Sequence, residues 1–525
     1  MRPPSGAWFA WLPVVFVGLF FAWPLATILW RGLSQGGADV LTSGLTWDVV
    51  RFTVVQAVLS TLLAVAAGLP AAYAVSRLRF RGRAAVSAVL TVPFVLPTVV
   101  VGASFRALLP ESWSGTLGAI LLAHVFLNLA VVVRVVGGFW AHLDDRYAQA
   151  ARTLGAGPVT VWRTVTWPLL RPSVLAAAAL VFLFTFTSFG VVLVLGGPTT
   201  STLEVEIYRR TVDLFDLPGA AMLCVLQVLA VGTVLLVASR LQRRLTVRQR
   251  LGRAQAAPRA VRTTADRVVL GVALLETALV AVPLVALALQ SVRVGDGWGL
   301  DWWRALSVEG PTTRDVAAWD SVRVSLSYAV VAVLISVVVG GAAACAVAYA
   351  RRGGDALDSA LALPLGTSAV TVGFGLLITF AVAPFDWRGS WVIVPIGHAV
   401  VAVPLVVRVV LPVLRSLDPR LREVAATLGA STSRSWRTVD VPALTRALGV
   451  GAGFAAAVSL GEFGATSFLA RADSPTLPVQ IGHLLSRQGE VNSGQAAALS
   501  VVLVVLTALA VLTTERLRAP GVGSL

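Results

Sequence analysis

The sequence predicts an all-α integral membrane protein of about twelve transmembrane helices, arranged as two parallel six-helix repeats. Three observations predict this fold. Of the 525 residues, 57% are hydrophobic and only 13% are charged, a composition too apolar for a soluble chain of this size. Apolar stretches of the roughly 20 residues that a helix needs to cross the hydrocarbon recur along the whole chain. A polar segment also occurs twice, 274 positions apart.

The apolar stretches give the elements in chain order. Six spans are expected first, at residues 8–30, 52–75, 84–109, 117–140, 172–196 and 219–240. Six more are expected at residues 268–290, 323–350, 356–383, 390–414, 446–470 and 495–515. The first stretch is long and rich in Trp, and no small-residue cleavage site follows it, so we expect a span rather than a signal peptide.

These elements divide the chain into a first six-helix repeat (1–240), a basic linker (241–267) and a second six-helix repeat (268–525). The matches extend beyond the polar segment, because Arg134 coincides with Arg408 at the same shift of 274. Each repeat holds an even number of spans and therefore enters and leaves on one side. The repeats are thus expected to be parallel, related by an axis along the membrane normal.

Arginines fix the expected orientation. They follow the second span between Arg77 and Arg83, and they fill the linker, so the positive-inside rule makes both segments cytoplasmic. Both termini and both copies of the polar segment then also lie in the cytoplasm. Contact with anionic lipid accounts for the net charge of +16, so the bilayer is an expected partner and nucleic acid is not.

Several kinds of site are not expected in this chain. It contains no lysine, so a phosphate-binding GxxxxGK[ST] loop cannot exist. Cys224 and Cys345 lack CxxC spacing and lie inside spans, and the four histidines are scattered. We also find no nucleophile–base constellation. The sequence therefore predicts no catalytic site and no metal site.

The repeated polar segment has matching residue types at one spacing. The first copy includes Gln149, Ala150, Ala151, Gly155, Val165 and Pro168, and the second includes Glu423, Ala425, Gly429, Val439 and Pro442. A short helical run precedes each glycine, which allows a sharp turn and the close approach of another surface. A second amphipathic stretch is expected to end at each proline. The pattern predicts two cytoplasmic helix–turn–helix knobs suited to a groove on a partner.

The repeated segment resembles the cytoplasmic signature of permease subunits of binding-protein-dependent ABC importers. That signature consists of EAA, three residues, Gly, nine residues, a branched aliphatic residue, one further residue and Leu-Pro. The chain departs from it at Gln149, and at Trp167 and Val441, which replace the leucine. The resemblance implies the type I ABC importer permease fold in a bacterial inner membrane. It also implies no cofactor in this chain, two copies of a cytoplasmic ABC ATPase that bind ATP and Mg, and an extracytoplasmic solute-binding protein. Because only the second copy has its glutamate, we expect damage there to impair transport more.

Fused two-repeat permeases of this length resemble importers of thiamine and of ferric iron. The residues 189–198, followed by Thr202-Leu203-Glu204-Val205-Glu206-Ile207-Tyr208, resemble the thiamine permease most. The resemblance therefore favours import of thiamine or its phosphates by ATP-driven alternating access, with ferric iron as the alternative. An ion-coupled secondary transporter is a third possibility, and it leaves the repeated polar segment unexplained.

Candidate residues for the translocation path or its gate are Glu462, Phe463, Phe189, His124 and His398. An ionisable group inside a span is costly and often lines a path. Sequences similar to that around Glu462 also occur in permeases for anions, which favours packing or gating over cation binding. The two histidines coincide at the shift of 274; lining the interface is one interpretation, and local hydrogen bonding is the favoured one. Glu204 is expected in an outward loop.

Overall fold

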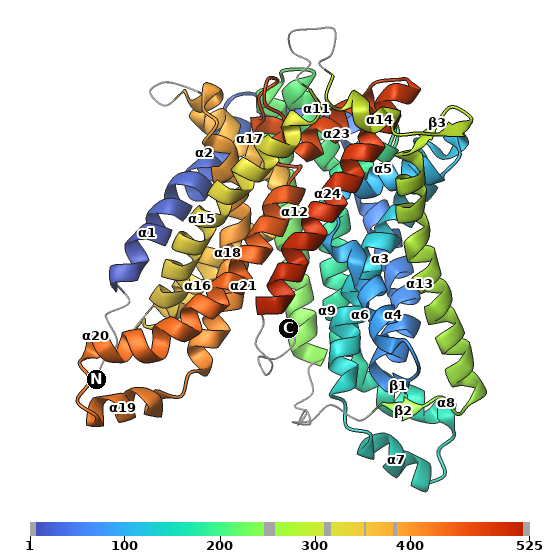
Figure 1. Ribbon diagram of the computed structural model, residues 1–525, viewed down its shortest axis with the longest axis vertical. Coiled ribbons are helices and arrows are strands. Elements are labelled where there is room, and N and C mark those ends of the chain that lie inside the picture. Colours follow the sequence, from blue (N-terminus) through green and yellow to red (C-terminus); the bar gives the residue numbers. More distant parts are fainter. Residues whose placement is uncertain (1–6, 246–257, 309–316, 351–352, 382–385, 518–525) are drawn as a thin grey trace.

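The computed structural model describes residues 7–245, 258–308, 317–350, 353–381 and 386–517. Within these ranges the chain forms a bundle of long helices, with short helices gathered at both ends (Figure 1). The middle of the predicted linker, residues 246–257, lies outside the described residues. We call the end that carries α7, α8, α19 and α20 the motif end, and the other the opposite end.

The first half follows this order: α1 (Ala7–Val17), a π-helical turn (Gly18–Ala22), α2 (Trp23–Ser34), a 3-10 segment (Gly37–Thr42), α3 (Gly44–Arg77), β1 (Leu78–Arg79), α4 (Arg83–Thr91), a 3-10 turn (Val92–Val95), α5 (Thr98–Leu108), a 3-10 turn (Glu111–Trp113), α6 (Leu117–Ala141), α7 (Arg146–Thr153), α8 (Pro158–Val161), a π-helical turn (Trp162–Thr166), α9 (Trp167–Phe186), α10 (Gly190–Leu195), α11 (Leu203–Val212) and α12 (Leu217–Leu245).

The second half repeats this order: β2 (Arg259–Ala260), α13 (Thr264–Gln290), β3 (Arg293–Val294), β4 (Gly297–Trp298), α14 (Asp301–Ala305), α15 (Asp320–Ala348), α16 (Gly354–Ala362), a 3-10 turn (Leu363–Gly366), α17 (Ala369–Phe380), a 3-10 turn (Trp387–Gly389), α18 (Ile393–Ser416), α19 (Pro419–Thr427), α20 (Thr432–Ser435), a π-helical turn (Trp436–Asp440), α21 (Val441–Gly461), α22 (Thr466–Leu469), α23 (Leu477–Ser486) and α24 (Glu490–Leu517).

Among the described residues, ten helices are long and apolar enough to cross a membrane, or up to twelve if each of two bent pairs counts as one span. The bent pairs are the spans expected at 84–109 and 356–383. The chain turns by 108° before α5 and by 96° before α17. Pro97 and Ser368 stand at these breaks as extended N-cap residues, which ends one helix and starts the next.

The first helices of the two halves are exchanged. In the first half, α1 packs against α15 and α2 against α17, while α13 of the second half packs against α3 and α5. Figure 1 shows α1 and α2 beside the second half and α13 beside α3 and α4. Each six-helix repeat therefore contributes helices to the surface of the other, and the halves are interlocked.

The end of the linker is fixed to the first half at the motif end. β2 pairs in parallel with β1, with Leu78 opposite Arg259. Asp266 forms a capping box with Thr263 at the start of α13. Its Oδ1 atom accepts hydrogen bonds from Arg259 Nη2 at 2.7 Å and from the Tyr73 hydroxyl at 3.2 Å. α13 therefore begins from a fixed position beside α3.

Candidate functional site

A cavity of about 440 Å³ lies between the two halves. Its wall includes four places where a helix is interrupted: Leu96 and Thr98, Ser188 and Phe189, Thr367 and Ser368, and Glu462 and Phe463. Interrupted helices in a membrane leave backbone groups free to line a polar space. The predicted spans 172–196 and 446–470 contribute two of these breaks, because α9 ends at Phe186 and α21 at Gly461.

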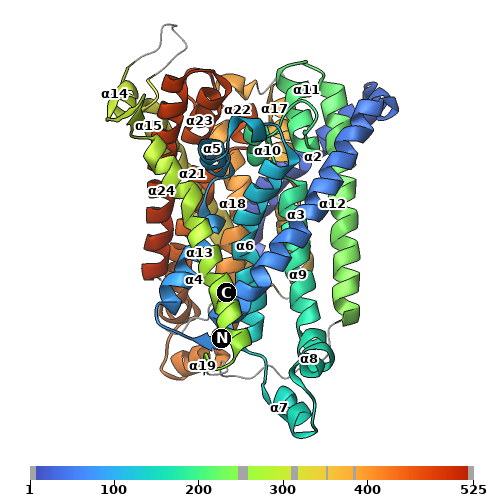
Figure 2. The same cartoon turned by 90° about the vertical axis from the view of Figure 1, so that its right-hand side faces the viewer.

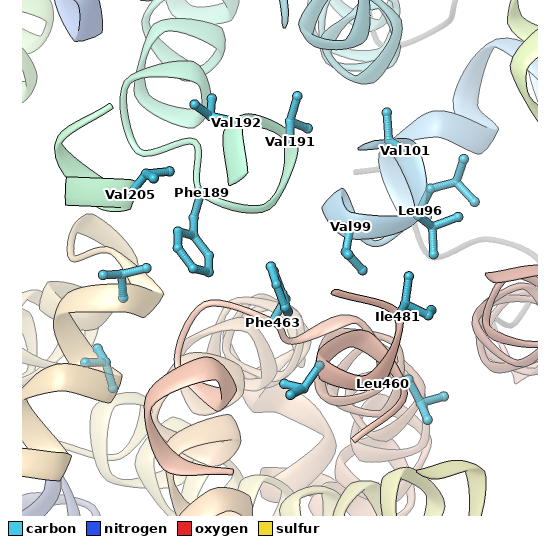
Figure 3. Packing of buried hydrophobic residues seen from close by; sticks show 14 of the residues in the cluster. Leu96, Val99, Val101, Phe189, Val191, Val192, Val205, Leu460, Phe463 and Ile481 are labelled. Atoms are coloured by element: carbon cyan, nitrogen blue, oxygen red, sulfur yellow. The ribbon is translucent and has the colours of Figure 1, made fainter. Parts of the chain in front are cut away.

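Aromatic side chains close one side of the cavity. Phe189 and Phe463 stack with ring centroids 5.2 Å apart, and Figure 3 shows the two rings facing one another among aliphatic side chains. Phe189 also contacts Tyr208 at 5.4 Å, and Tyr208 contacts Phe468 at 5.6 Å. These residues belong to or adjoin α10, α11 and α22, which lie toward the opposite end (Figure 2). We call Phe189, Tyr208, Phe463 and Phe468 the aromatic plug.

Gly190 makes the aromatic stack possible. A Cβ atom at this position would lie 3.1 Å from Phe463 Cδ1 and only 2.4 Å from Thr98 Oγ1. Since real Cβ atoms do not approach an oxygen that closely, a side chain at this position would displace Thr98 and press against the Phe463 ring. The Phe-Gly pair that the sequence repeats is therefore a packing requirement as well as a motif.

Two carboxylates line the cavity, one from each half. Glu462 is 8% exposed, and its Oε1 atom accepts a hydrogen bond from the Ala465 amide at 2.8 Å. Glu204 is fully buried, so the expectation that it lies in an outward loop is wrong. Its Oε2 atom accepts a hydrogen bond from Ser368 Oγ at 2.9 Å, and its Oε1 atom accepts one from Gln227 Nε2.

The backbone explains why Glu204 points inward. The amide of Leu203, at the start of α11, donates to Thr53 Oγ1 on α3 at 3.0 Å. In the second half, the amide of Leu477 donates to Ser325 Oγ on α15 at 2.7 Å. The matching Thr-Leu pairs in the sequence are thus two equivalent attachment points. The equivalence of these pairs in the sequence does not show that the attachment at Leu203 carries Glu204 into the cavity wall.

The two predicted histidines are both fully hydrogen-bonded. His124 contacts Ser60 Oγ at 3.0 Å through Nδ1 and Ser188 Oγ at 2.8 Å through Nε2. His398 contacts Ser459 and Thr466 at 2.8 and 2.7 Å. His124 borders the cavity, whereas His398 is not part of its lining. These contacts agree with local hydrogen bonding. The two histidines do not form a symmetric pair at the interface, because only His124 lines the cavity.

The two knobs have the same turn at the motif end. Gly155 and Gly429 have φ values of +83° and +80°. The amide of Gly155 donates to Arg152 O and that of Ala156 to Ala151 O; Gly429 and Ala430 donate in the same way to Ala426 O and Ala425 O. This paired arrangement is the Schellman motif, which needs a residue with positive φ after the helix. The turn therefore requires a residue that adopts positive φ readily, and glycine does so without strain.

The outer faces of the knobs are exposed and partly apolar. Leu154 is 88% exposed and its equivalent Leu428 is 82% exposed. Gln149 and Glu423 are also exposed, on α7 and α19. Among the described residues, nothing would lie within 4 Å of a Cβ atom added at Gly155 or Gly429. Each knob therefore carries an exposed leucine next to its turn.

The expected break at Pro168 and Pro442 is absent. α8 continues through a π-helical turn (Trp162–Thr166) into α9, and α20 continues through the corresponding turn (Trp436–Asp440) into α21. Each proline is the second residue of the α-helix that follows. The wider π turn accommodates the missing amide hydrogen without ending the helix. Each knob is therefore joined to a membrane span by continuous helix.

The knobs are attached differently to the helices above them. Near α7, Arg77 at the end of α3 forms an ion pair with Asp145. In the second half, Arg422 of α19 donates from Nε to Asp440 Oδ2 at 3.1 Å, and the Tyr349 hydroxyl donates to Asp440 Oδ1 at 2.8 Å. The hydrogen bond to Asp440 raises the pKa of Arg422. The pKa of Tyr349 is also raised, mainly by burial and secondly by its hydrogen bond to Asp440.

Comparison with known proteins decides the family. Residues 64–250 match the model of the binding-protein-dependent transport system inner membrane component. The chain is 34% identical over 178 residues to the molybdenum transport system permease protein ModB of Azotobacter vinelandii, and it covers 78% of that protein. This chain belongs to the family of binding-protein-dependent transport system permeases. The permease thus has the type I ABC importer permease fold.

Two further similarities concern the permease as a whole. It is 28% identical over 512 residues to the thiamine transport system permease protein ThiP of Brucella abortus (strain 2308), covering 92% of this chain and 90% of that protein. The crystal structure of a bacterial ABC transporter involved in the import of the acidic polysaccharide alginate matches 45% of the permease and 93% of the solved chain, with a TM-score of 0.40 and 15% identity.

Proposed function

We propose that the permease carries thiamine or its phosphates across a bacterial inner membrane by ATP-driven alternating access. The observation that carries this proposal is the similarity to the Brucella thiamine permease, which extends over 92% of this chain and includes both halves. It favours thiamine over ferric iron. A cavity of about 440 Å³ also falls in the range of roughly 300–1,000 Å³ that holds a small organic solute.

Two copies of a separate ATPase dock on the knobs in this proposal, one on α7–α8 and one on α19–α20. The support is the shared Schellman turn, the exposed Leu154 and Leu428, and their common location at the motif end. The motif end is then cytoplasmic, together with both termini. An external solute-binding protein delivers the solute at the opposite end, near α11 and α23. ATP and Mg bind the ATPase and not this chain.

Alternating access uses the continuous helices that join each knob to its span. When the ATPases close on ATP, the knobs approach each other and α9 and α21 move with them. The aromatic plug, which is closed in this structure, then parts and the cavity opens toward the binding protein. To shift such an equilibrium from 1:99 to 99:1, ATP must favour the second state by about 5.5 kcal/mol.

ATPase stimulation tests the proposal. The permease is placed in nanodiscs with its ATPase, and ATP hydrolysis is measured after adding the cognate binding protein, either empty, loaded with thiamine or loaded with ferric iron. Stimulation by the thiamine-loaded protein alone is expected. Stimulation only with ferric iron would replace thiamine by the alternative solute, and the absence of any effect of the ATPase on transport would favour an ion-coupled transporter.

A further inference from the structure

We propose that the cavity holds the cationic ring of its solute between two carboxylates, Glu204 and Glu462, beside the aromatic side chains of its lining. The inference rests on the proposed function, because thiamine carries its positive charge on an aromatic thiazolium ring. It goes further by naming the part of the cavity that recognises the charge. The solute class is an organic aromatic cation.

The charge of the cavity wall is the first argument. Its lining contains Glu204 and Glu462 and no arginine, in a chain without lysine. Neither carboxylate takes part in an ion pair with the described residues. Both carboxylates line the same cavity. Buried charges of one sign are costly without a countercharge, which a bound cation would supply.

The hydrogen bonds around the carboxylates orient them and do not neutralise them. Glu204 accepts from the hydroxyl of Ser368 and the amide of Gln227, and Glu462 accepts from the amide of Ala465. All three donors are neutral. Ser368 belongs to the second half and Glu204 to the first, so the carboxylate is held at the boundary along which the halves separate.

The aromatic rings are the second argument. Phe94, Phe184, Phe189 and Phe463 all belong to the lining, and a cation is attracted to the face of an aromatic ring within about 6 Å of its centre. Arg134 makes such a contact with Phe94 at 5.9 Å but is not itself part of the lining. The cavity therefore offers both kinds of group that bind organic cations.

The third argument is that the repeat breaks where the charges stand. At the shift of 274, Glu462 corresponds to Ser188 and Glu204 to Pro478. Ser188 forms a hydrogen bond with His124. The first half therefore contributes an uncharged hydroxyl at the position where the second half contributes the carboxyl group of Glu462. Each carboxylate of the cavity wall is therefore present in only one of the two halves.

A comparison of a charged with an uncharged solute tests the inference. Proteoliposomes contain the permease with its ATPase and binding protein. Uptake is measured for thiamine and for an isostere whose thiophene ring replaces the thiazolium, each at a concentration that saturates the binding protein. The variants are Glu204→Gln, Glu462→Gln and both together. The readout is the ratio of thiamine uptake to isostere uptake, compared between wild type and variant. Any preference of the binding protein for one solute affects both permeases equally and therefore does not change this comparison.

The double variant is expected to lower this ratio about tenfold or more, equivalent to about 1.4 kcal/mol. Glu204→Asp and Glu462→Asp, which keep the charge, should retain most of the ratio. Glu206→Gln is the matched control, since Glu206 lies on the same helix, pairs with Arg210 and does not line the cavity. If the double variant is inactive, the ratio is read from the single variants.

The two possible failures are distinguishable. Wild-type proteoliposomes that take up no thiamine would overturn the proposed function. Wild-type uptake of thiamine together with an unchanged ratio in the Gln variants would overturn the inference alone, and would indicate that both carboxylates are protonated packing residues. An equal fall in the ratio for Glu206→Gln would also overturn it, because the effect would then not be local to the cavity.

Discussion

Phe189 and Phe463 occupy equivalent positions in the two halves and stack on one another, with ring planes 29° apart and centroids separated by 5.2 Å. Two copies of one sequence feature thus meet at the boundary between the halves. In the proposed mechanism this contact is lost when the cavity opens toward the binding protein. Its strength therefore contributes to the balance between the two states of the transporter.

Phe463→Ala is expected to weaken closure at the aromatic plug. An aromatic pair contributes about 0.5–1.5 kcal/mol beyond its buried area, so ATP hydrolysis without binding protein should rise by about threefold to tenfold. The measurement is basal ATPase activity in nanodiscs. Phe182→Ala is the control, because Phe182 stacks on Phe186 within α9 and not across the halves. Equal activation by both variants would contradict a gating role.

Substitutions at Gly429 should separate backbone conformation from side-chain size. A left-handed conformation costs an ordinary residue roughly 1–2 kcal/mol, whereas Asn adopts it more readily. We therefore expect Gly429→Val to abolish most binding-protein-stimulated ATP hydrolysis and Gly429→Asn to retain much of it. Gly157→Ala should be silent, since Gly157 is in an ordinary extended conformation with open space around it. Loss of activity in Gly429→Asn equal to that in Gly429→Val would argue against the turn.

Arg422→Ala should loosen the attachment of α19 to the π turn that leads into α21. The variant leaves Asp440, which is buried, with only the Tyr349 hydroxyl as a side-chain partner among the described residues, and an unpaired buried charge costs about 1–3 kcal/mol or more. Binding of the ATPase should persist while stimulated hydrolysis falls. Arg437→Ala, at an exposed position of the same π turn, serves as the control. Unchanged stimulation in Arg422→Ala would contradict a role for this ion pair in coupling.

The two docking surfaces are expected to be unequal. Leu154→Asp and Leu428→Asp each place a charge on an exposed leucine, and each should weaken ATPase binding without affecting folding. The larger loss of ATPase binding is expected for Leu428→Asp, because its knob has the glutamate of the family pattern at Glu423, whereas the other knob has Gln149 at that position. Pull-down of the ATPase by each variant measures this. A larger loss for Leu154→Asp would contradict the expected order. The variant Gln149→Glu should make ATPase binding at the two knobs more nearly equal.

Hydropathy was sufficient to predict the bundle of membrane helices, and the internal repeat was sufficient to predict that Gly155 and Gly429 adopt the same turn, because these features depend on composition and spacing. They did not predict which prolines interrupt a helix. Pro97 stands at a break of 108°, whereas Pro404 and Pro412 lie inside the continuous α18. The residue type is the same in each case, so the presence of proline alone does not predict a break.

Glu204 shows a second limit of sequence reasoning. It lies in a short amphipathic segment whose other glutamate, Glu206, pairs with Arg210, and an outward loop was the natural expectation. Its burial depends on contacts distant in the chain, from Thr53 to Leu203 and from Ser368 to Glu204 itself. The repetition of the Thr-Leu pair at 202–203 and 476–477 is the sequence feature that indicates a fixed attachment of this segment to the neighbouring helices.

The most direct test of the central claim is ATP-dependent uptake of labelled thiamine by proteoliposomes that contain the permease, its ATPase and the external binding protein. We predict accumulation of thiamine only when ATP and all three components are present, and none without the ATPase. Uptake that persists without the ATPase, or a complete system that hydrolyses ATP and moves no thiamine, would contradict the account.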